Sequence, residues 1–200
     1  MDLCLKEGRL LMVASPARTR RYSIRDLADF PADGKLRELV DGSVVEWDVP
    51  TYRHSFLLVA LSAEVRSFVR QRRLGQVVGG DTMVRIEESE FDARGADIAF
   101  FQRGNRPQDI DAAATERVPD FVVEIISPPD RADRVMDKVR DWLRAGVRLL
   151  WYINPQTGIV TVYQGGQIRH LGPGETLDGG DVLPGFAIRL SDLLQELEDG

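Results

Sequence analysis

Two short apolar segments, each interrupted by one acidic residue, constrain the fold of this chain most strongly. Residues 96–101 read Ala-Asp-Ile-Ala-Phe-Phe, and residues 121–126 read Phe-Val-Val-Glu-Ile-Ile before a Ser-Pro-Pro sequence. Short apolar runs bounded by turn-forming residues are typical of buried strands. A carboxylate inside a buried strand is destabilising unless a cation meets it. Asp97 and Glu124 are therefore the first candidates for a functional site.

The pattern around these two segments predicts a mixed sheet with helices packed on it. The expected helices are residues 23–30, 53–73, 134–145 and 190–197. The expected strands are residues 36–40, 43–47, 81–87, 94–101, 121–126, 148–154, 159–164 and 167–171. An Asp-Gly pair at 41–42 predicts the first hairpin. A strand, a helix and a second strand over residues 121–153 predict a crossover between parallel strands.

Length and composition narrow the class of protein. Two hundred residues predict one domain, over residues 22–200, behind a loose lead over residues 1–21. The formal net charge of −6 argues against a protein that holds nucleic acid by bulk electrostatics, although a local basic patch stays open. Cys4 is the only cysteine, which excludes a disulfide framework. No apolar stretch approaches the length of a membrane span, and we expect a cytoplasmic protein.

Each acidic candidate has a structural alternative. Strand alternation could place Asp97 on an outer face together with Ala99. The small residues Ala96 and Ala99 are compatible with either face, so this alternative stays open. Glu124 lies between apolar residues on both sides, which is typical of a central parallel strand. Its alternative is a buried pair with an arginine. Ligands bind beyond strand ends in open sheets of this kind, which favours a functional interpretation of Glu124.

Further polar residues could join these two acids. Lys138 lies at the edge of the apolar stripe of its predicted helix, and its long stem could carry an ammonium to the carboxylates. It could instead pair at the surface with Asp137 or Asp141. Strand alternation places Glu38 on the same face of the first hairpin as apolar residues, so it could extend the acidic site. Glu46 could also extend it, but a position on the outer face is favoured for this residue.

Two groups of residues at the ends of the long predicted helix, 53–73, each allow a functional and a structural interpretation. His54 at its start could bind phosphate, or it could cap and pack. With so few histidines in the chain, a histidine-based metal site or catalytic triad is disfavoured. Its end carries Arg70, Arg72 and Arg73, and cations at this position interact favourably with the negative end of the helix dipole. The same arginines could contact phosphate.

The chain resembles the Uma-type restriction-endonuclease family of the PD-(D/E)XK nuclease superfamily, over about residues 22–195. The resemblance rests on the order and spacing of short segments, among them Glu-Leu-Val-Asp-Gly at 38–42 and Val-Glu-Ile-Ile-Ser-Pro at 123–128. The segments that carry it are residues 38–42, 53–54, 96–100, 123–128, 138, 144–147, 151–155 and 183–186. It implies an α/β (α+β) fold with a restriction-endonuclease-like mixed central sheet flanked by helices.

The resemblance also implies roles for individual residues. Asp97 is similar to the aspartate of the family motif, and Glu124 to its second acid. The proline expected before the aspartate is Ala96, and the lysine expected two residues after the second acid is replaced by Ile126. The following helix supplies that lysine function in this family, at the position of Lys138.

These considerations predict a metal-dependent nuclease. Asp97, Glu124 and the carbonyl of Ile125 would hold Mg²⁺, with Mn²⁺ as a substitute, and Lys138 and Glu38 would complete the catalytic set. The expected substrate is nucleic acid, with DNA favoured over RNA, and analogy to other nucleases favours a homodimer. The competing hypothesis is a catalytically inactive nuclease fold that binds DNA or serves in assembly. A toxin-like or mobile-element accessory nuclease is a further alternative.

Overall fold

The computed structural model describes residues 20–33, 35–128 and 130–199. Its helices are the 3₁₀ helix η1 (Ile24–Asp29) and the α-helices α1 (Tyr52–Arg72), α2 (Ala132–Ala145) and α3 (Leu190–Asp199). Its main strands are β1 (Leu36–Val40), β2 (Ser43–Trp47), β3 (Gly75–Arg85), β4 (Ala93–Gln102), β5 (Phe121–Ile125), β6 (Leu149–Asn154), β7 (Ile159–Gln164) and β8 (Gln167–Leu171). Two short strands, β9 (Thr176–Asp178) and β10 (Ala187–Arg189), form a separate ribbon.

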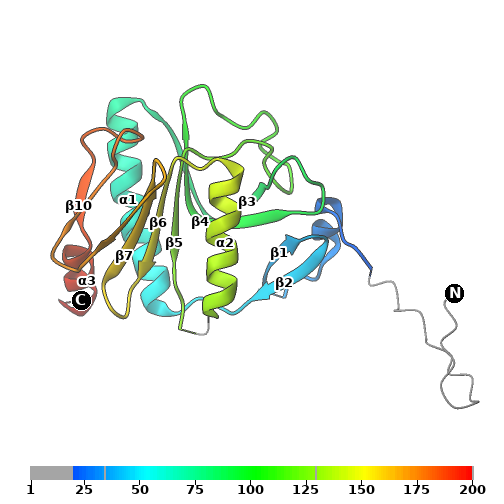
Figure 1. Ribbon diagram of the computed structural model, residues 1–200, viewed down its shortest axis with the longest axis horizontal. Helices are drawn as coiled ribbons and strands as arrows, with labels where there is room; N and C mark the ends of the chain where they lie inside the picture. Colours follow the sequence, from blue (N-terminus) through cyan, green and yellow to red (C-terminus); the bar gives the residue numbers. More distant parts are fainter. Residues whose placement is uncertain (1–19, 34, 129, 200) are drawn as a thin grey trace, which may run out of the picture.

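One mixed sheet organises the described residues (Figure 1). Its order is β2-β1-β4-β5-β6-β7-β8, and β3 pairs with β4 along the length of that strand. β5 and β6 are parallel, whereas their other neighbours are antiparallel. Because the ends of parallel strands cannot meet in a tight turn, α2 makes the crossover between them. The predicted strand–helix–strand unit over residues 121–153 is therefore confirmed.

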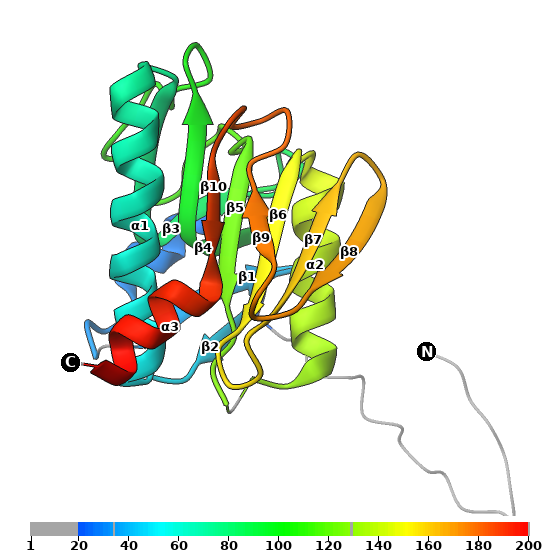
Figure 2. The same ribbon diagram turned by 90° about the vertical axis from the view of Figure 1, so that its left-hand side faces the viewer.

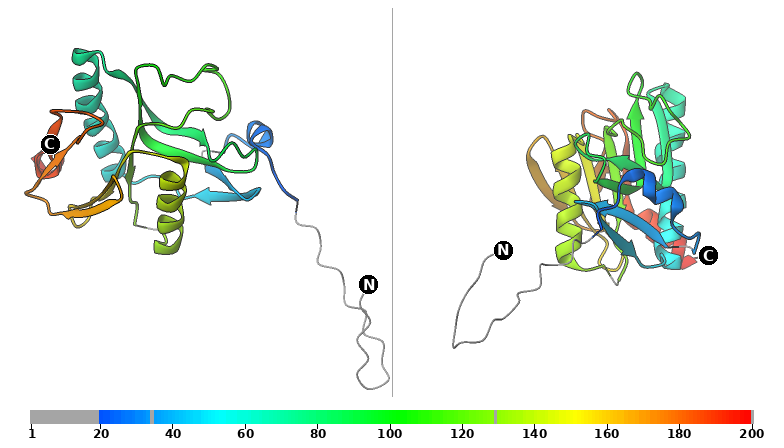
Figure 3. Two further views of the ribbon diagram at one scale, coloured as in Figure 1. Left: turned by 45° about the horizontal axis from the view of Figure 1, so that its top comes forward. Right: turned by 90° about the vertical axis from the view of Figure 1, so that its right-hand side faces the viewer.

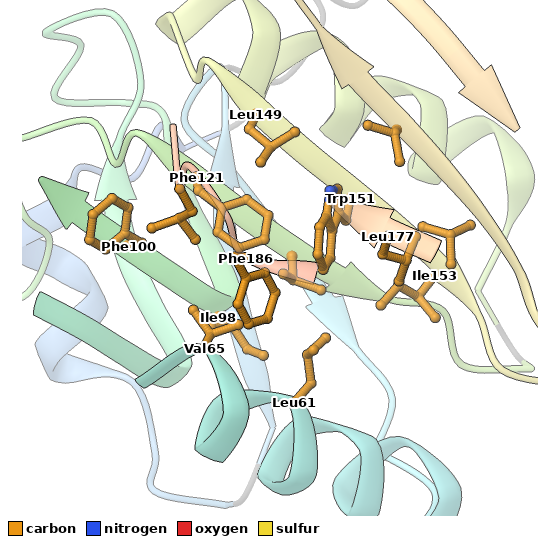
Figure 4. Close-up of a cluster of buried hydrophobic side chains, with 14 of the residues drawn as sticks. Leu61, Val65, Ile98, Phe100, Phe121, Leu149, Trp151, Ile153, Leu177 and Phe186 are labelled. Atoms are coloured by element: carbon orange, nitrogen blue, oxygen red, sulfur yellow. The ribbon is translucent and has the colours of Figure 1, made fainter. Parts of the chain in front are cut away.

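Helices cover both faces of the sheet. Figures 2 and 3 show α1 on one face and α2 on the other, with the strands between them. Leucine and valine recur every fourth position of α1, which places them on one side of the helix. These residues, Leu57, Leu61, Val65 and Val69, pack on the cluster around Phe121 and Trp151 (Figure 4). On the opposite face, Val139 and Trp142 of α2 pack with Val122 and Leu150.

The ends of the elements differ from the sequence prediction in several places. The left-handed residue that ends α1 is Arg73, with φ +55°, and Gly75 is the first residue of β3. Gly75 is needed for a different reason, since a Cβ there would lie 2.0 Å from the carbonyl oxygen of Phe101. β3 starts six residues earlier than expected, at residue 75 rather than 81, and β9 and β10 were not predicted. Both short strands lie in glycine-rich sequence with no alternating pattern.

Other expectations lie at the N-terminal side of the chain. The predicted loose lead over residues 1–21 falls almost entirely outside the described residues. The predicted helix near residues 23–30 is a 3₁₀ helix, and the Ser23 hydroxyl donates to the Asp26 carboxylate at 2.7 Å.

Across the described parts of the chain, no helix combines the length and apolar character needed to cross a membrane.

Replacing a core leucine of α1 should show how strongly this helix is held. Leu61 is 1% exposed, and Leu61→Ala is expected to lower the free energy of unfolding by about 2–5 kcal/mol, because a cavity replaces its buried side chain. Val59 on the same helix is 70% exposed, so Val59→Ala should change it by less than about 0.5 kcal/mol. Urea denaturation measures both. Equal losses in the two variants would contradict the packing described here.

Candidate active site

A small acidic cavity lies where the end of β5 meets the starts of α1 and α2. It has a volume of about 60 Å³, which is room for a few water molecules. Five carboxylates, one lysine and one histidine contribute to its walls together with apolar residues. The polar and charged lining residues are Asp48, His54, Asp81, Asp97, Glu124, Ser127, Asp130, Lys138 and Tyr152.

Asp97 reaches the cavity from β4. The paired residues Ile98 and Val123 set the register of β4 and β5, so that Asp97 faces Glu124 one step beyond the last paired residues. The Asp97 Oδ2 atom accepts a hydrogen bond from the Ile125 backbone nitrogen at 2.7 Å and lies 3.3 Å from the Nε2 atom of His54. The Asp97 side chain is thus fixed through one oxygen, and strand alternation does not carry it to an outer face.

Glu124 is held from α2. Its Oε2 atom lies 2.9 Å from the Lys138 ammonium, and its Oε1 atom accepts a hydrogen bond from the Trp142 indole nitrogen at 2.7 Å. Lys138 and Trp142 are four residues apart, so they share one side of the helix and reach the same carboxylate. The ring of Trp142 is buried in the core, and its nitrogen also orients Glu124.

Glu38 lies next to Lys138 and is fully buried. Its Oε1 atom lies 3.0 Å from the Lys138 ammonium and accepts a hydrogen bond from the Gly95 nitrogen at 2.9 Å. Its Oε2 atom lies 3.0 Å from the Arg94 guanidinium, which also contacts Asp141. Both oxygens are therefore engaged by the protein. Glu38 is placed to hold Lys138, and it is not among the residues that line the cavity.

The pKa shifts follow from burial and from the surplus of carboxylates. Burial, reinforced by the charge of Asp97, raises the pKa of Glu124 to about 8 although Lys138 opposes the change. Burial also raises the pKa values of Asp81 and Asp130. For Glu38 burial acts in the same direction, but Lys138 and Arg94 outweigh it and lower the pKa. Burial would lower the pKa of Lys138, but the surrounding carboxylates raise it, which keeps the ammonium charged.

The donor set suits a small hard cation. Burial raises the pKa values of several carboxylates at this cavity, and too little positive charge lies beside them to offset this. A divalent ion would supply that charge. Mg²⁺ uses one or two carboxylates and keeps several waters, so Asp97 and Glu124 with a backbone carbonyl are sufficient. In the described part of the chain, no group of three or more His, Cys, Asp and Glu side chains is arranged to hold a metal ion.

Most of the predicted residues gather at this site, and their partners were only partly foreseen. Lys138 contacts Glu38 and Glu124 rather than the surface acids Asp137 and Asp141. Asp137 pairs with Arg140, while Asp141 pairs with Arg94 and Arg144. Among the described residues, the partner of Glu124 is Lys138 rather than an arginine, and the buried Arg94 pairs with Glu38.

The remaining sequence candidates divide between the cavity and the surface. Ile125 and His54 both line the cavity, and the buried Nδ1 atom of His54 has no hydrogen-bond partner among the described residues. Glu46 lies outside the site, because its carboxylate pairs with Lys35 and Arg37 at the surface. The interpretation of Glu46 as an outer residue therefore agrees with its position.

Asp81 and Asp130 are lining residues that the sequence analysis did not single out. Asp130 follows the Ser-Pro-Pro turn after β5, and its place beyond a strand end was an available signal. Asp81 has φ +61° where the pairing of β3 with β4 shifts between Gly79 and Thr82. Such a bulge turns a side chain toward a site, and sequence alone gives no comparable indication of it.

The buried contacts of Glu38 should be important for stability. Glu38→Gln removes the charge that faces both Lys138 and Arg94, and it is expected to lower the free energy of unfolding by about 3–5 kcal/mol. The matched control is Glu46→Gln on the neighbouring strand, whose exposed, solvent-screened pairs should contribute little to stability. Chemical denaturation of both variants checks the difference. A loss from Glu38→Gln no larger than that of its control would contradict the buried network.

The raised pKa of Glu124 should appear in the pH dependence of stability. Because its pKa rises from 4.5 to about 8 on folding, the native state binds the proton more tightly than the unfolded state. Its contribution is fully present below pH 4.5 and is lost as the pH rises through about 8. Urea unfolding in EDTA should show a shallower decline for Glu124→Gln than for the wild type over that interval. Parallel curves would disprove the shift.

Comparison with known proteins places the chain in a family. The Uma2 family, described as "Putative restriction endonuclease", matches residues 24–191. A crystal structure from Anabaena variabilis, described as a "putative nuclease belonging to DUF820", is similar with a TM-score of 0.76 and 18% sequence identity, covering 88% of this chain and 98% of that chain. No curated protein matches. The structural similarity confirms the expected fold, a restriction-endonuclease-like mixed sheet flanked by helices. With most of its length matched, the protein belongs to the Uma2 family.

Proposed function

We propose that this protein is a magnesium-dependent endonuclease that hydrolyses phosphodiester bonds of nucleic acid, with DNA as the substrate. One observation carries the proposal. The Lys138 ammonium lies 2.9 Å from Glu124, and both line the cavity that Asp97 enters from the neighbouring strand. Two acids from adjacent strands and one amine are the groups that hydrolysis of a phosphodiester at a metal ion requires. The family and the nuclease-like fold support the same reaction class.

Each residue has a defined task in this proposal. Asp97, Glu124 and the Ile125 carbonyl would bind the ion, which would supply positive charge at the phosphate and a more acidic water. The Ile125 nitrogen fixes the Asp97 carboxylate, so that its other oxygen can serve as a ligand. Lys138 stays charged at neutral pH and would orient water or offset negative charge that develops at phosphorus. Glu38 would position Lys138 and would not touch the substrate.

A catalytically inactive nuclease fold that binds DNA is the second candidate, and two observations favour it. The Lys138 ammonium already contacts two carboxylates, and the cavity of about 60 Å³ is too small for a nucleotide. Trp47, Asp48 and Pro50, at the end of β2 and in the segment that follows it, form part of its wall and would border an entering substrate. Under the enzyme proposal the segment opens for the substrate.

We also propose a homodimer, in which two such sites would cut the two strands.

Cleavage assays on single- and double-stranded DNA and RNA, with Mg²⁺ or Mn²⁺, test the proposal. Asp97→Asn, Glu124→Gln and Lys138→Met should each lower the cleavage rate by about a hundredfold or more, because each removes a ligand or a charge that acts in the transition state. Glu64→Gln, an exposed acid on α1, is the control and should cleave like the wild type. EDTA should abolish cleavage, and added Mg²⁺ should restore it.

A readout independent of cleavage separates the two candidates. Mg²⁺ binding to the folded state should raise the melting temperature of the wild type, and Asp97→Asn should lose this rise. An enzyme should show both the metal effect and cleavage. A melting temperature that does not respond to Mg²⁺, together with unchanged DNA in every assay, would favour the inactive fold.

A further inference from the structure

A second charged surface lies at the far end of the molecule from the active site. Six exposed arginines gather where α1 and β4 end, and we call this group the distal arginine patch. Its members are Arg66, Arg70, Arg72, Arg73, Arg103 and Arg106. A hydrogen bond from the Arg103 nitrogen to the Leu74 carbonyl oxygen, at 2.7 Å, joins the two segments that carry it.

The patch is well separated from the catalytic residues. His54 at the active site and Arg72 in the patch lie near opposite ends of α1, about 27 Å apart at the rise of an α-helix. Figure 1 shows α1 running from the end of β5 at the bottom of the view to the loop after β4 at the top. The patch therefore cannot act on the phosphate that is being cleaved, and any ligand it binds occupies a separate site.

The arginines of the patch are not neutralised by the protein. In the described residues, none of the six forms an ion pair, whereas many arginines elsewhere do: Arg37, Arg94, Arg140, Arg144, Arg148, Arg169 and Arg189 all pair with carboxylates. The favourable position at a helix end explains Arg70 and Arg72 alone. It does not explain Arg103 and Arg106, which come from the loop after β4. On a chain of net charge −6, such a concentration of exposed, unpaired cations would attract an external anion.

Two hollows give the patch its shape. One, of about 380 Å³, is lined by Arg73, Arg103 and Arg106, and the other, of about 360 Å³, is lined by Arg66 and Arg70. They share Gly75 and Gln76, so they lie side by side across the start of β3. No acidic side chain lines either hollow, within the described chain.

We infer that the distal arginine patch is a second nucleic-acid contact surface, which binds the phosphate backbone without sequence preference and independently of the metal. Guanidinium groups bind phosphate oxygens in pairs, and adjacent hollows suit successive phosphates of one strand. A protein partner would need exposed aromatic anchors, whereas Phe101, the aromatic ring in these hollows, is 2% exposed. The choice of nucleic acid as the ligand rests on the proposed function.

Arg73 offers a variant that separates binding from folding. It has φ +55° at the left-handed end of α1, a conformation that glycine adopts without strain. Arg73→Gly should therefore keep or raise the melting temperature while it weakens binding. A variant whose binding falls only because the fold is damaged would show the opposite change in melting temperature.

Fluorescence anisotropy with a labelled DNA duplex of about 40 base pairs, in EDTA and at several salt concentrations, tests the inference. The combined change Arg66→Gln, Arg103→Gln and Arg106→Gln should weaken binding roughly tenfold or more and reduce the salt slope by roughly three, one for each lost phosphate contact. The control combines Arg140→Gln, Arg169→Gln and Arg189→Gln, which changes the net charge equally but removes arginines that already pair with acids. It should bind nearly as well as the wild type.

The outcomes distinguish this inference from the proposed function. Equal binding by the patch variant and the control would overturn the inference, even if the wild type cleaves DNA. Loss of binding in the patch variant would support it, even if no cleavage is found. Poly-glutamate that displaces the duplex as well as unlabelled DNA would overturn the choice of nucleic acid in favour of an acidic protein. For an active wild type, the patch variant should raise KM for long duplexes and leave kcat unchanged.

Discussion

The buried ammonium of Lys138, held between Glu38 and Glu124, is the interaction on which the site depends. It joins three elements that are far apart in sequence: β1, β5 and α2. Each carboxylate would be destabilising in the interior by itself, and each is retained because the same cation meets it. The raised pKa of Glu124 shows that one ammonium does not fully compensate the acids around it. In the proposed function, a divalent ion would supply the positive charge that the site lacks.

The sheet supplies the precision that the chemistry requires. Register between β4 and β5 sets Asp97 opposite Glu124, and the crossover helix brings Lys138 and Trp142 onto the second acid. The backbone nitrogen of Ile125 ties the two acids together through Asp97. The functional groups are therefore carried on rigid elements, so that their orientation follows from the packing of the fold. In the proposed function, Lys138 of α2 would take the role of the lysine that the family motif expects at the position of Ile126, directly after β5.

Charge is separated along the molecule. The start of α1 borders the acidic cavity, whereas its other end carries exposed arginines that form no ion pair with other described residues. A negative protein that acts on a polyanion faces repulsion over most of its surface, and a local cationic region offsets it. Under the proposals made above, the acidic cavity and the distal arginine patch would meet two different requirements: one would hold a cation for the reaction, and the other would hold the substrate chain.

The sequence by itself determined the strands that carry Asp97 and Glu124, the Asp-Gly hairpin, the α1 and α2 helices and the parallel crossover, because apolar periodicity and turn residues act locally. It also indicated the family through the spacing of short segments. Only the tertiary structure decided that Arg94 pairs with Glu38, that Trp142 donates to Glu124, and that Asp81 turns into the cavity at a bulge. These contacts join residues distant in the chain, and partner choice among buried charges depends on distances of a few ångströms that no local pattern encodes.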